Sequence, residues 1–100
     1  MTAEMDIQLE HGGAGATATV SVSGEIDLSN IERFRAALDV EAASLVVDLG
    51  EVTYIDSAGM GVLFARAARG PLEVRCEATS VVSPLIDITR LCDVAVIRRK

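Results

Sequence analysis

The chain has 100 residues, which is enough for one domain with its own core and too few for two. Half of its residues are hydrophobic, so burial can stabilise the fold without a disulfide or metal framework. The formal net charge is −6 and 3% of the residues are aromatic. Both values argue against nucleic-acid binding, which uses basic surfaces and aromatic stacking platforms.

Targeting and membrane signals are not visible in the sequence. Residues 1–10 lack the basic segment and apolar run of a signal peptide, and no apolar run approaches the ~18 residues of a membrane helix. We therefore expect a cytoplasmic protein without membrane insertion. Cys76 and Cys92 fall on apolar positions far apart in the sequence, which predicts two buried, reduced thiols. The basic residues 98–100 are interpreted as a solvated tail.

Hydrophobic periodicity predicts the element order β-β-α-β-α-β-α-β. Ser29 and Glu32 have the spacing of a capping box, which places the start of the first helix at Ser29. In chain order the predicted elements are strands 5–9 and 18–23, a turn at 24–27, a helix from 29, a strand 45–49 that stops at a turn, a short run 52–55, helix 57–69, strand 72–76, helix 80–91 and strand 94–97.

This order predicts an α/β fold with a mixed, mostly parallel sheet of four to five strands. Strands separated by helices imply parallel pairing, whereas the first two strands form a hairpin. The polar and apolar alternation of the second strand places the helices mainly on one sheet face. We expect a single domain over residues 1–100. Its predicted core comprises Phe34, Leu38, Val46, Val47, Leu49, Leu63, Phe64, Val74, Leu85 and Ile86.

The most informative segment is D-S-A-G at residues 56–59, because it follows an apolar run and opens an amphipathic helix. Ser57 is therefore expected at a helix N-terminus, where free N–H groups and the helix dipole favour a phosphate. The structural alternative is that Ser57 is only an N-cap. Gly59 and Gly61 each cost a helix about 1 kcal/mol relative to alanine. They favour either close packing on the sheet or a flat turn that a partner can approach.

A hydrolase nucleophile is a weaker interpretation of Ser57. The G-x-S-x-G motif fails because Ile55 stands where the first glycine belongs. The single histidine, His11, lies in the hairpin loop and precedes the serine, whereas that fold places it after. A Ser-His-Asp triad is therefore disfavoured.

Nucleotide and metal sites are also not indicated. Residues 59–61 could begin G-x-G-x-x-G, but Phe64 occupies the third glycine position, and the phosphate-binding G-x-x-x-x-G-K-[ST] motif is missing. The nearby carboxylates, which lack the spacing of a metal loop, are Glu25, Asp27, Asp48 and Asp56. No cofactor is expected.

Three segments together resemble the anti-sigma factor antagonist family, the small bacterial form of the STAS domain. They are V-S-G-E-I-D at 22–27, L-V-V-D-L at 45–49 and V-T-Y-I-D-S-A-G-M-G-V-L at 52–63, and residues 82–91 are similar to the late helix of the family. The resemblance covers about residues 5–97. It implies a STAS-like fold and a protein without catalysis of its own, which binds an anti-sigma factor that is also a serine kinase and so releases a sigma factor.

The resemblance further implies that the kinase phosphorylates Ser57 with its own ATP and that a PP2C-type phosphatase removes the phosphate. The implied partner-binding residues are Glu25, Asp27, Asp56, Ser57, Ala58, Gly59, Met60 and Gly61. Ala58 stands where many relatives have Ser or Thr, so the motif carries one hydroxyl. STAS domains also serve in stressosome-like complexes and lipid-transport ATPases, which remain alternatives, and as tails of anion transporters, which the lack of a membrane span excludes.

Overall fold

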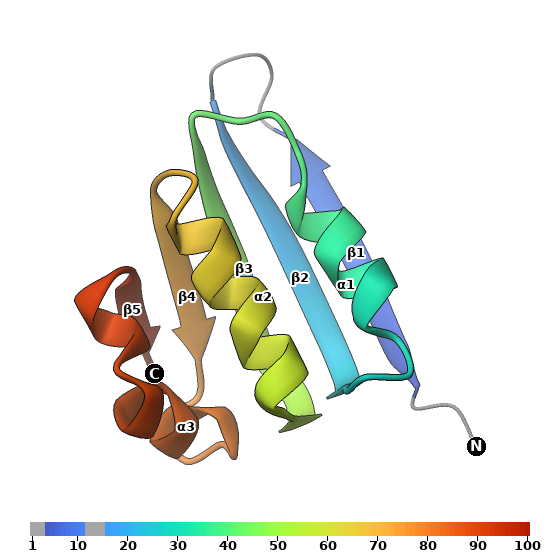
Figure 1. Ribbon diagram of the computed structural model, residues 1–100, viewed down its shortest axis with the longest axis vertical. Coiled ribbons are helices and arrows are strands. Elements are labelled where there is room, and N and C mark those ends of the chain that lie inside the picture. The colour runs from blue at the N-terminus through green and yellow to red at the C-terminus, as the bar shows by residue number, and fades with distance from the viewer. Residues whose placement is uncertain (1–3, 12–15) are drawn as a thin grey trace.

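The strands form one sheet whose spatial order, β1-β2-β3-β4-β5, is also their order along the chain (Figure 1). The computed structural model describes residues 4–11 and 16–100. The strands are β1 (Met5–His11), β2 (Thr17–Ile26), β3 (Ser44–Ile55), β4 (Leu72–Cys76) and β5 (Val96–Arg99). β1 pairs antiparallel with β2, and all other neighbours pair parallel. The expected mixed, mostly parallel sheet is thus confirmed.

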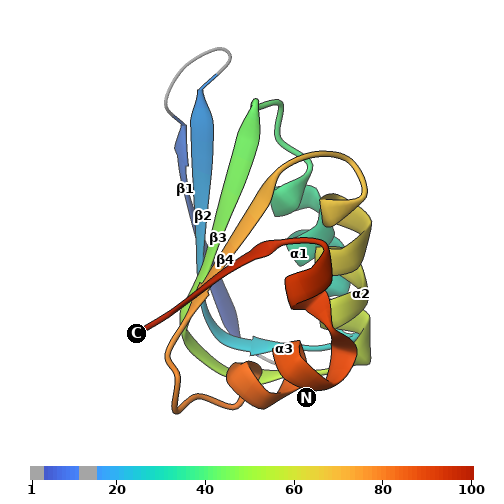
Figure 2. The same ribbon diagram turned by 90° about the vertical axis from the view of Figure 1, so that its left-hand side faces the viewer.

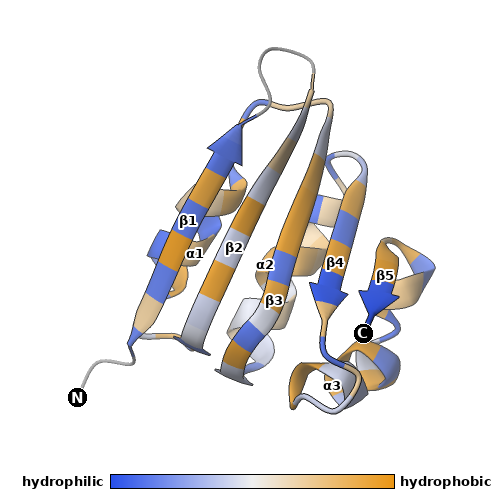
Figure 3. Ribbon diagram, turned by 180° about the vertical axis from the view of Figure 1, so that it is seen from behind, coloured by the Kyte–Doolittle hydropathy of each residue, from blue (hydrophilic) through white to orange (hydrophobic). Residues whose placement is uncertain are grey.

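The helices connect the parallel strands and cover one face of the sheet. They are α1 (Ile31–Leu38), α2 (Ser57–Ala67) and α3 (Val82–Thr89), followed by the short 3₁₀ turn η1 (Leu91–Asp93). Figure 2 shows α1 and α2 on the same side of the sheet, with α3 across the lower end of that layer. Figure 3 shows the opposite face without helices, where hydrophobic and hydrophilic bands alternate along the strands. The two-layer arrangement explains why β2 alternates between apolar and polar residues.

The core lies between the sheet and the helices. Of the residues predicted as core, those that are buried are Phe34, Leu38, Val46, Val47, Leu49, Leu63, Val74 and Ile86. Phe64 and Leu85 are only partly buried and pack against the core. Each is adjacent in sequence to a fully buried residue, Leu63 or Ile86, so the helical rotation between neighbours places it at the flank of the apolar face.

The turn predicted after residue 49 is wrong, because β3 is one continuous strand of 12 residues. Gly50 lies in an irregular part of the ladder: Ser21 pairs with Asp48, but Ser23 pairs with Glu51. β3 therefore carries one more residue than β2 over this interval, as in a β-bulge. The Asp48 carboxylate accepts a hydrogen bond from Gly50 N at 2.9 Å, which supports the extra residue locally. A turn-like sequence here produces a bulge inside a strand.

The capping box predicted for α1 is also wrong. The helix begins at Ile31, and Asn30 occupies the cap position without a side-chain cap hydrogen bond. Ser29 N instead donates to Asp27 Oδ1 at 2.8 Å, and Glu32 pairs with Arg35. The Asp27 carboxylate thus forms a local turn that competes with capping by Ser29.

The C-terminal elements differ from prediction because α3 ends early. Arg90 adopts a left-handed conformation with φ 61°, which stops α3 at Thr89 and starts η1. This turn buries Leu91 and leaves Cys92 exposed, so the expectation that both cysteines are buried holds for Cys76 alone. β5 includes Arg98 and Arg99, and Arg99 contacts Asp87 at 2.6 Å. These two basic residues are therefore part of the sheet rather than a free tail.

The two glycines of α2 have different surroundings. A Cβ on Gly59 would lie 2.6 Å from Ile55 Cγ1 and 2.9 Å from Ile26 Cγ2, which is closer than carbon atoms approach without rearrangement. A Cβ on Gly61 would meet no atom within 4 Å. The first turn of α2 therefore packs directly on the ends of β2 and β3 at Gly59, whereas Gly61 faces open space.

We predict that Leu63→Ala destabilises the fold by about 2–5 kcal/mol, because Leu63 is fully buried and its truncation leaves a cavity beneath α2. Ile88→Ala on α3 is the control, since Ile88 is 77% exposed and should change the free energy of unfolding by no more than about 0.5 kcal/mol. Urea denaturation measures both. A loss below about 1 kcal/mol for Leu63→Ala would contradict the described packing of α2.

Alanine substitutions of Gly59 and Gly61 should change the free energy of unfolding in opposite directions. We expect Gly59→Ala to destabilise by about 1–3 kcal/mol through overpacking against Ile55. Gly61→Ala should stabilise by up to about 1 kcal/mol, because alanine has the higher helix propensity and its methyl group meets nothing. Thermal and urea unfolding of the two variants give the comparison, and equal effects would show that Gly59 is not at a close contact.

Candidate functional site

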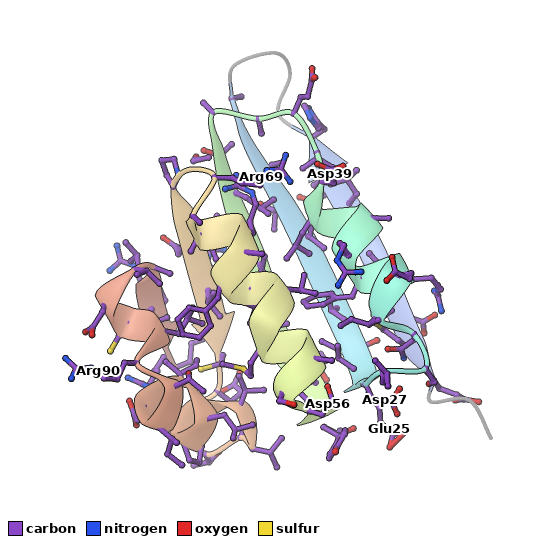
Figure 4. All side chains as sticks on the ribbon, in the orientation of Figure 1. Glu25, Asp27, Asp39, Asp56, Arg69 and Arg90 are labelled. Carbon is purple, nitrogen blue, oxygen red and sulfur yellow. The ribbon has the colours of Figure 1, made fainter. Side chains whose placement is uncertain are left out.

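The two motifs that the sequence singled out meet at one end of the sheet. β2 and β3 run parallel, and their last paired residues are Ile26 and Ile55. Asp56 N donates to Ile26 O at 3.2 Å, which joins the two strand ends directly. Figure 4 shows Glu25, Asp27 and Asp56 together at this end of the molecule. The segments 24–27 and 56–59 thus lie side by side, as the parallel pairing of the two preceding strands requires.

The Asp56 carboxylate links both segments. Its Oδ1 accepts a hydrogen bond from Gly59 N at 3.1 Å and caps α2. Its Oδ2 accepts one from Leu28 N at 3.2 Å, in the loop between β2 and α1. The interpretation of Ser57 as the helix cap is therefore wrong, because Asp56 performs that role and Ser57 is the first residue of the helix. The Ser57 side chain is exposed and is not needed for capping.

The loop before α1 is held by a residue that the sequence analysis missed. Asn30 is 4% exposed; its Nδ2 donates to Glu25 O at 2.8 Å, and its Oδ1 accepts from Asp27 N at 3.0 Å. One buried amide thus bridges two backbone positions of the loop. The available signal was the asparagine three residues after an aspartate, a pairing typical of side-chain-supported turns. The loop that carries Asp27 is fixed in place beside Asp56.

Near this end of the sheet, Gly24 of β2 packs closely against the backbone that leads into β1. Its φ is +89°, and a Cβ there would lie 2.3 Å from Glu4 O. Glu25 N donates to the same carbonyl oxygen at 2.8 Å. Only glycine tolerates both this conformation and this approach without strain.

The predicted site residues separate into an outer and an inner group. The exposed residues are Glu25, Ser57 and Gly61, the partly buried ones are Asp27, Asp56 and Ala58, and the buried ones are Gly59 and Met60. A partner that docks at this end can touch the outer group directly. Gly59 and Met60 are on the face of α2 that packs on the sheet. Met60 belongs to the hydrophobic core, and Gly59 lies against Ile55 and Ile26.

Two exposed hydrophobic side chains adjoin the acidic residues and were also missed. Leu28 is 75% exposed in the loop that donates to Asp56, and Tyr54 is 49% exposed opposite Glu25 in the β2–β3 register. Exposed apolar side chains next to charged ones are typical of protein-binding surfaces. Leu28 was detectable as a leucine within an otherwise polar loop.

The surroundings of Ser57 do not assemble a catalytic triad. His11 lies at the end of β1 that pairs with the start of β2, whereas Ser57 follows β3, whose end pairs with the opposite end of β2. His11 Nε2 is 3.0 Å from Glu41 O.

Within residues 4–11 and 16–100, no cluster of three or more His, Cys, Asp or Glu could hold a metal ion. In the same residues, none of the helices has both the length and the apolar character of a membrane span.

Comparisons with solved structures find the same fold in anti-sigma factor antagonists. One from Mycobacterium paratuberculosis has a TM-score of 0.79 at 24% identity, covering 98% of this chain and 90% of that one. Unphosphorylated SpoIIAA has a TM-score of 0.71 at 20% identity, covering 92% and 87%. The STAS domain of an antagonist from Rhodobacter sphaeroides has a TM-score of 0.56 at 21% identity, covering 72% and 84%.

A comparison with curated protein sequences finds no match. A family model described as "Mlab, STAS domain" matches residues 10–95. The match spans most of the chain, and it includes β2, β3 and α2, which build the site. The chain therefore belongs to the STAS domain family.

Proposed function

We propose that the chain is an anti-sigma factor antagonist that binds an anti-sigma factor with serine kinase activity, releases a sigma factor and is switched off by phosphorylation of Ser57. The observation that carries the proposal is the exposed Ser57 at the start of α2, directly after Asp56, whose carboxylate accepts a hydrogen bond from the loop that follows Asp27. The similar structures named as anti-sigma factor antagonists support it. The protein itself would act by binding in the bacterial cytoplasm, and a PP2C-type phosphatase would reset it.

The position of Ser57 allows phosphorylation without a change of fold. Because Asp56 caps α2, the Ser57 hydroxyl has no capping role that modification would disrupt. A phosphate there adds about −1.5 to −2 charges at a helix N-terminus, where the helix dipole favours negative charge. The modified protein should therefore stay folded.

The neighbouring carboxylates explain how the phosphate would prevent binding. Glu25, Asp27 and Asp56 already make this end acidic, and the loop that carries Asp27 is fixed by Asn30. A kinase docked on the surface formed with Leu28 and Tyr54 would have to bury the added phosphate beside these charges. Like-charge contacts and desolvation would then weaken the complex without a large conformational change.

A STAS subunit of another complex, such as a stressosome-like or lipid-transport assembly, is the second candidate. The description of the matching family model, which names Mlab, supports this candidate, whereas the names of the similar structures support an anti-sigma factor antagonist. A kinase-dependent change of binding distinguishes the two candidates. A small-ligand or hydrolase role of Ser57 is disfavoured by the distant position of His11.

We predict that an anti-sigma factor kinase from the same genome adds one phosphate to the protein and none to Ser57→Ala. Ser57→Ala should keep binding and change stability by no more than about 0.5 kcal/mol, because the cap is Asp56. Phosphorylated protein should bind at least about tenfold more weakly, and Ser57→Asp should fall between, since one carboxylate carries less charge. Intact-mass analysis and calorimetry are the measurements.

Ser29→Ala is the matched control, since Ser29 is an exposed serine in the neighbouring loop and should leave the added phosphate unchanged. Asp56→Asn separates capping from charge, because an asparagine can still accept from Gly59 N and caps a helix about as well as aspartate, whereas it removes one carboxylate next to Ser57. Equal affinity of the phosphorylated and unmodified proteins would overturn the switch. A reaction of Ser57 with an acyl or phosphonate probe without kinase would favour an enzyme instead.

A further inference from the structure

A pocket between α1 and α2 lies at the end of α2 opposite Ser57. It has a volume of about 120 Å³ and is lined by Arg35, Leu38, Val62, Ala65, Arg66 and Arg69. Three of the nine Lys and Arg residues of an acidic chain therefore converge on one small pocket, and its described lining includes no carboxylate. This concentration of positive charge is opposite in sign to the rest of the molecule.

Arg66 forms the base of the pocket and is 6% exposed. Among the residues that the structure describes, no carboxylate lies within ion-pair distance of its guanidinium. Burial, and secondarily the positive charge of Arg69, lower the pKa of Arg66, but a guanidinium remains charged at neutral pH. A buried charge without a counter-ion is unfavourable, so an anion that reaches it gains an interaction that the protein leaves unmade.

One of the hydrogen-bond donors of Arg66 has a structural role. Its Nη1 donates to Gly70 O at 3.1 Å, which ties the end of α2 to the turn before β4. A guanidinium has five N–H donors, so this contact uses one of them. Within the described part of the chain, the single side-chain N or O that is both sealed from solvent and without a partner is Ser80 Oγ. The remaining donors of Arg66, which lines the pocket, are therefore not sealed from solvent.

The two other arginines stand at the rim and are held by weak pairs. Arg69 contacts Asp39 at 2.8 Å, with both side chains more than half exposed, and Arg35 pairs with Glu32 within α1. Figure 4 shows Arg69 and Asp39 facing each other from the ends of α2 and α1. Exposed pairs of this kind contribute little stability, so both guanidinium groups can turn toward an anion at small cost.

We propose that this α1–α2 pocket binds a small phosphoryl oxyanion, such as inorganic phosphate or a phosphate monoester, with Arg66 at its base and Arg35 and Arg69 at its rim. A tetrahedral dianion offers oxygens to several guanidinium groups at once, whereas a carboxylate offers one planar edge that a single arginine satisfies. The pocket volume admits a phosphate group but not a nucleotide. Binding would neutralise the buried charge and hold α1 against α2.

The test is the thermal unfolding midpoint of the full chain as inorganic phosphate is titrated at pH 7.5, compared with sodium chloride at equal ionic strength. A phosphate concentration about ten times Kd should raise the midpoint by about 5–10 °C beyond the chloride value. Arg66→Met, which keeps an apolar stem and removes the charge, should lose this shift. Arg69→Gln should keep the fold, because Arg69 is exposed, and should weaken phosphate binding at least about threefold.

Arg90→Gln is the matched control, because Arg90 is an exposed arginine paired with Asp93 at the far side of the molecule (Figure 4). It should keep the full phosphate shift. In amide and guanidinium NMR spectra, phosphate should move the Nε resonance of Arg66 and leave that of Arg90 in place. A phosphate effect no larger than that of chloride, a shift retained by Arg66→Met, or an equal shift with acetate would each overturn the proposal.

Discussion

The carboxylate of Asp56 is the contact on which the candidate site depends. It accepts from Gly59 N in α2 and from Leu28 N in the preceding loop, so one side chain fixes a helix start and a loop 28 residues away in sequence. Because both donors are backbone groups, these two contacts depend on a single side chain, that of Asp56. Ser57 is exposed as a consequence, since its neighbour supplies the cap that a serine often supplies.

The parts of the fold that follow from periodicity could be predicted from the sequence. Alternation in β2 indicated a one-sided sheet, and the order of strands and helices indicated parallel pairing, which in turn places the ends of β2 and β3 at the same edge. The proximity of Asp27 and Asp56 was therefore predictable. These features arise from burial over whole elements, and a single competing contact does not change them.

Other features depend on individual competing contacts, and periodicity carries no information about them. Asp27 binds Ser29 N and so removes the expected capping box, and Gly50 enters a bulge because β3 continues beyond it. The left-handed conformation of Arg90 ends α3, and the turn that follows leaves Cys92 exposed to solvent. The burial of Asn30 and Arg66 was unpredictable for a related reason: polar residues in a loop and on a helix are usually exposed, and only tertiary packing shows otherwise.

The two ends of α2 present opposite electrostatic problems to an anion. Under the proposed switch, the helix dipole would favour a phosphate on Ser57 while Asp27 and Asp56 would disfavour it, so the net effect on folding would be small and the effect on a docked partner large. At the other end the dipole disfavours an anion, because the C-terminal turn of a helix carries partial negative charge. Arg66 already donates to one nearby carbonyl, at Gly70. An oxyanion can therefore be held there only by guanidinium charge, which makes the arginines, rather than the helix backbone, the source of any affinity at that end.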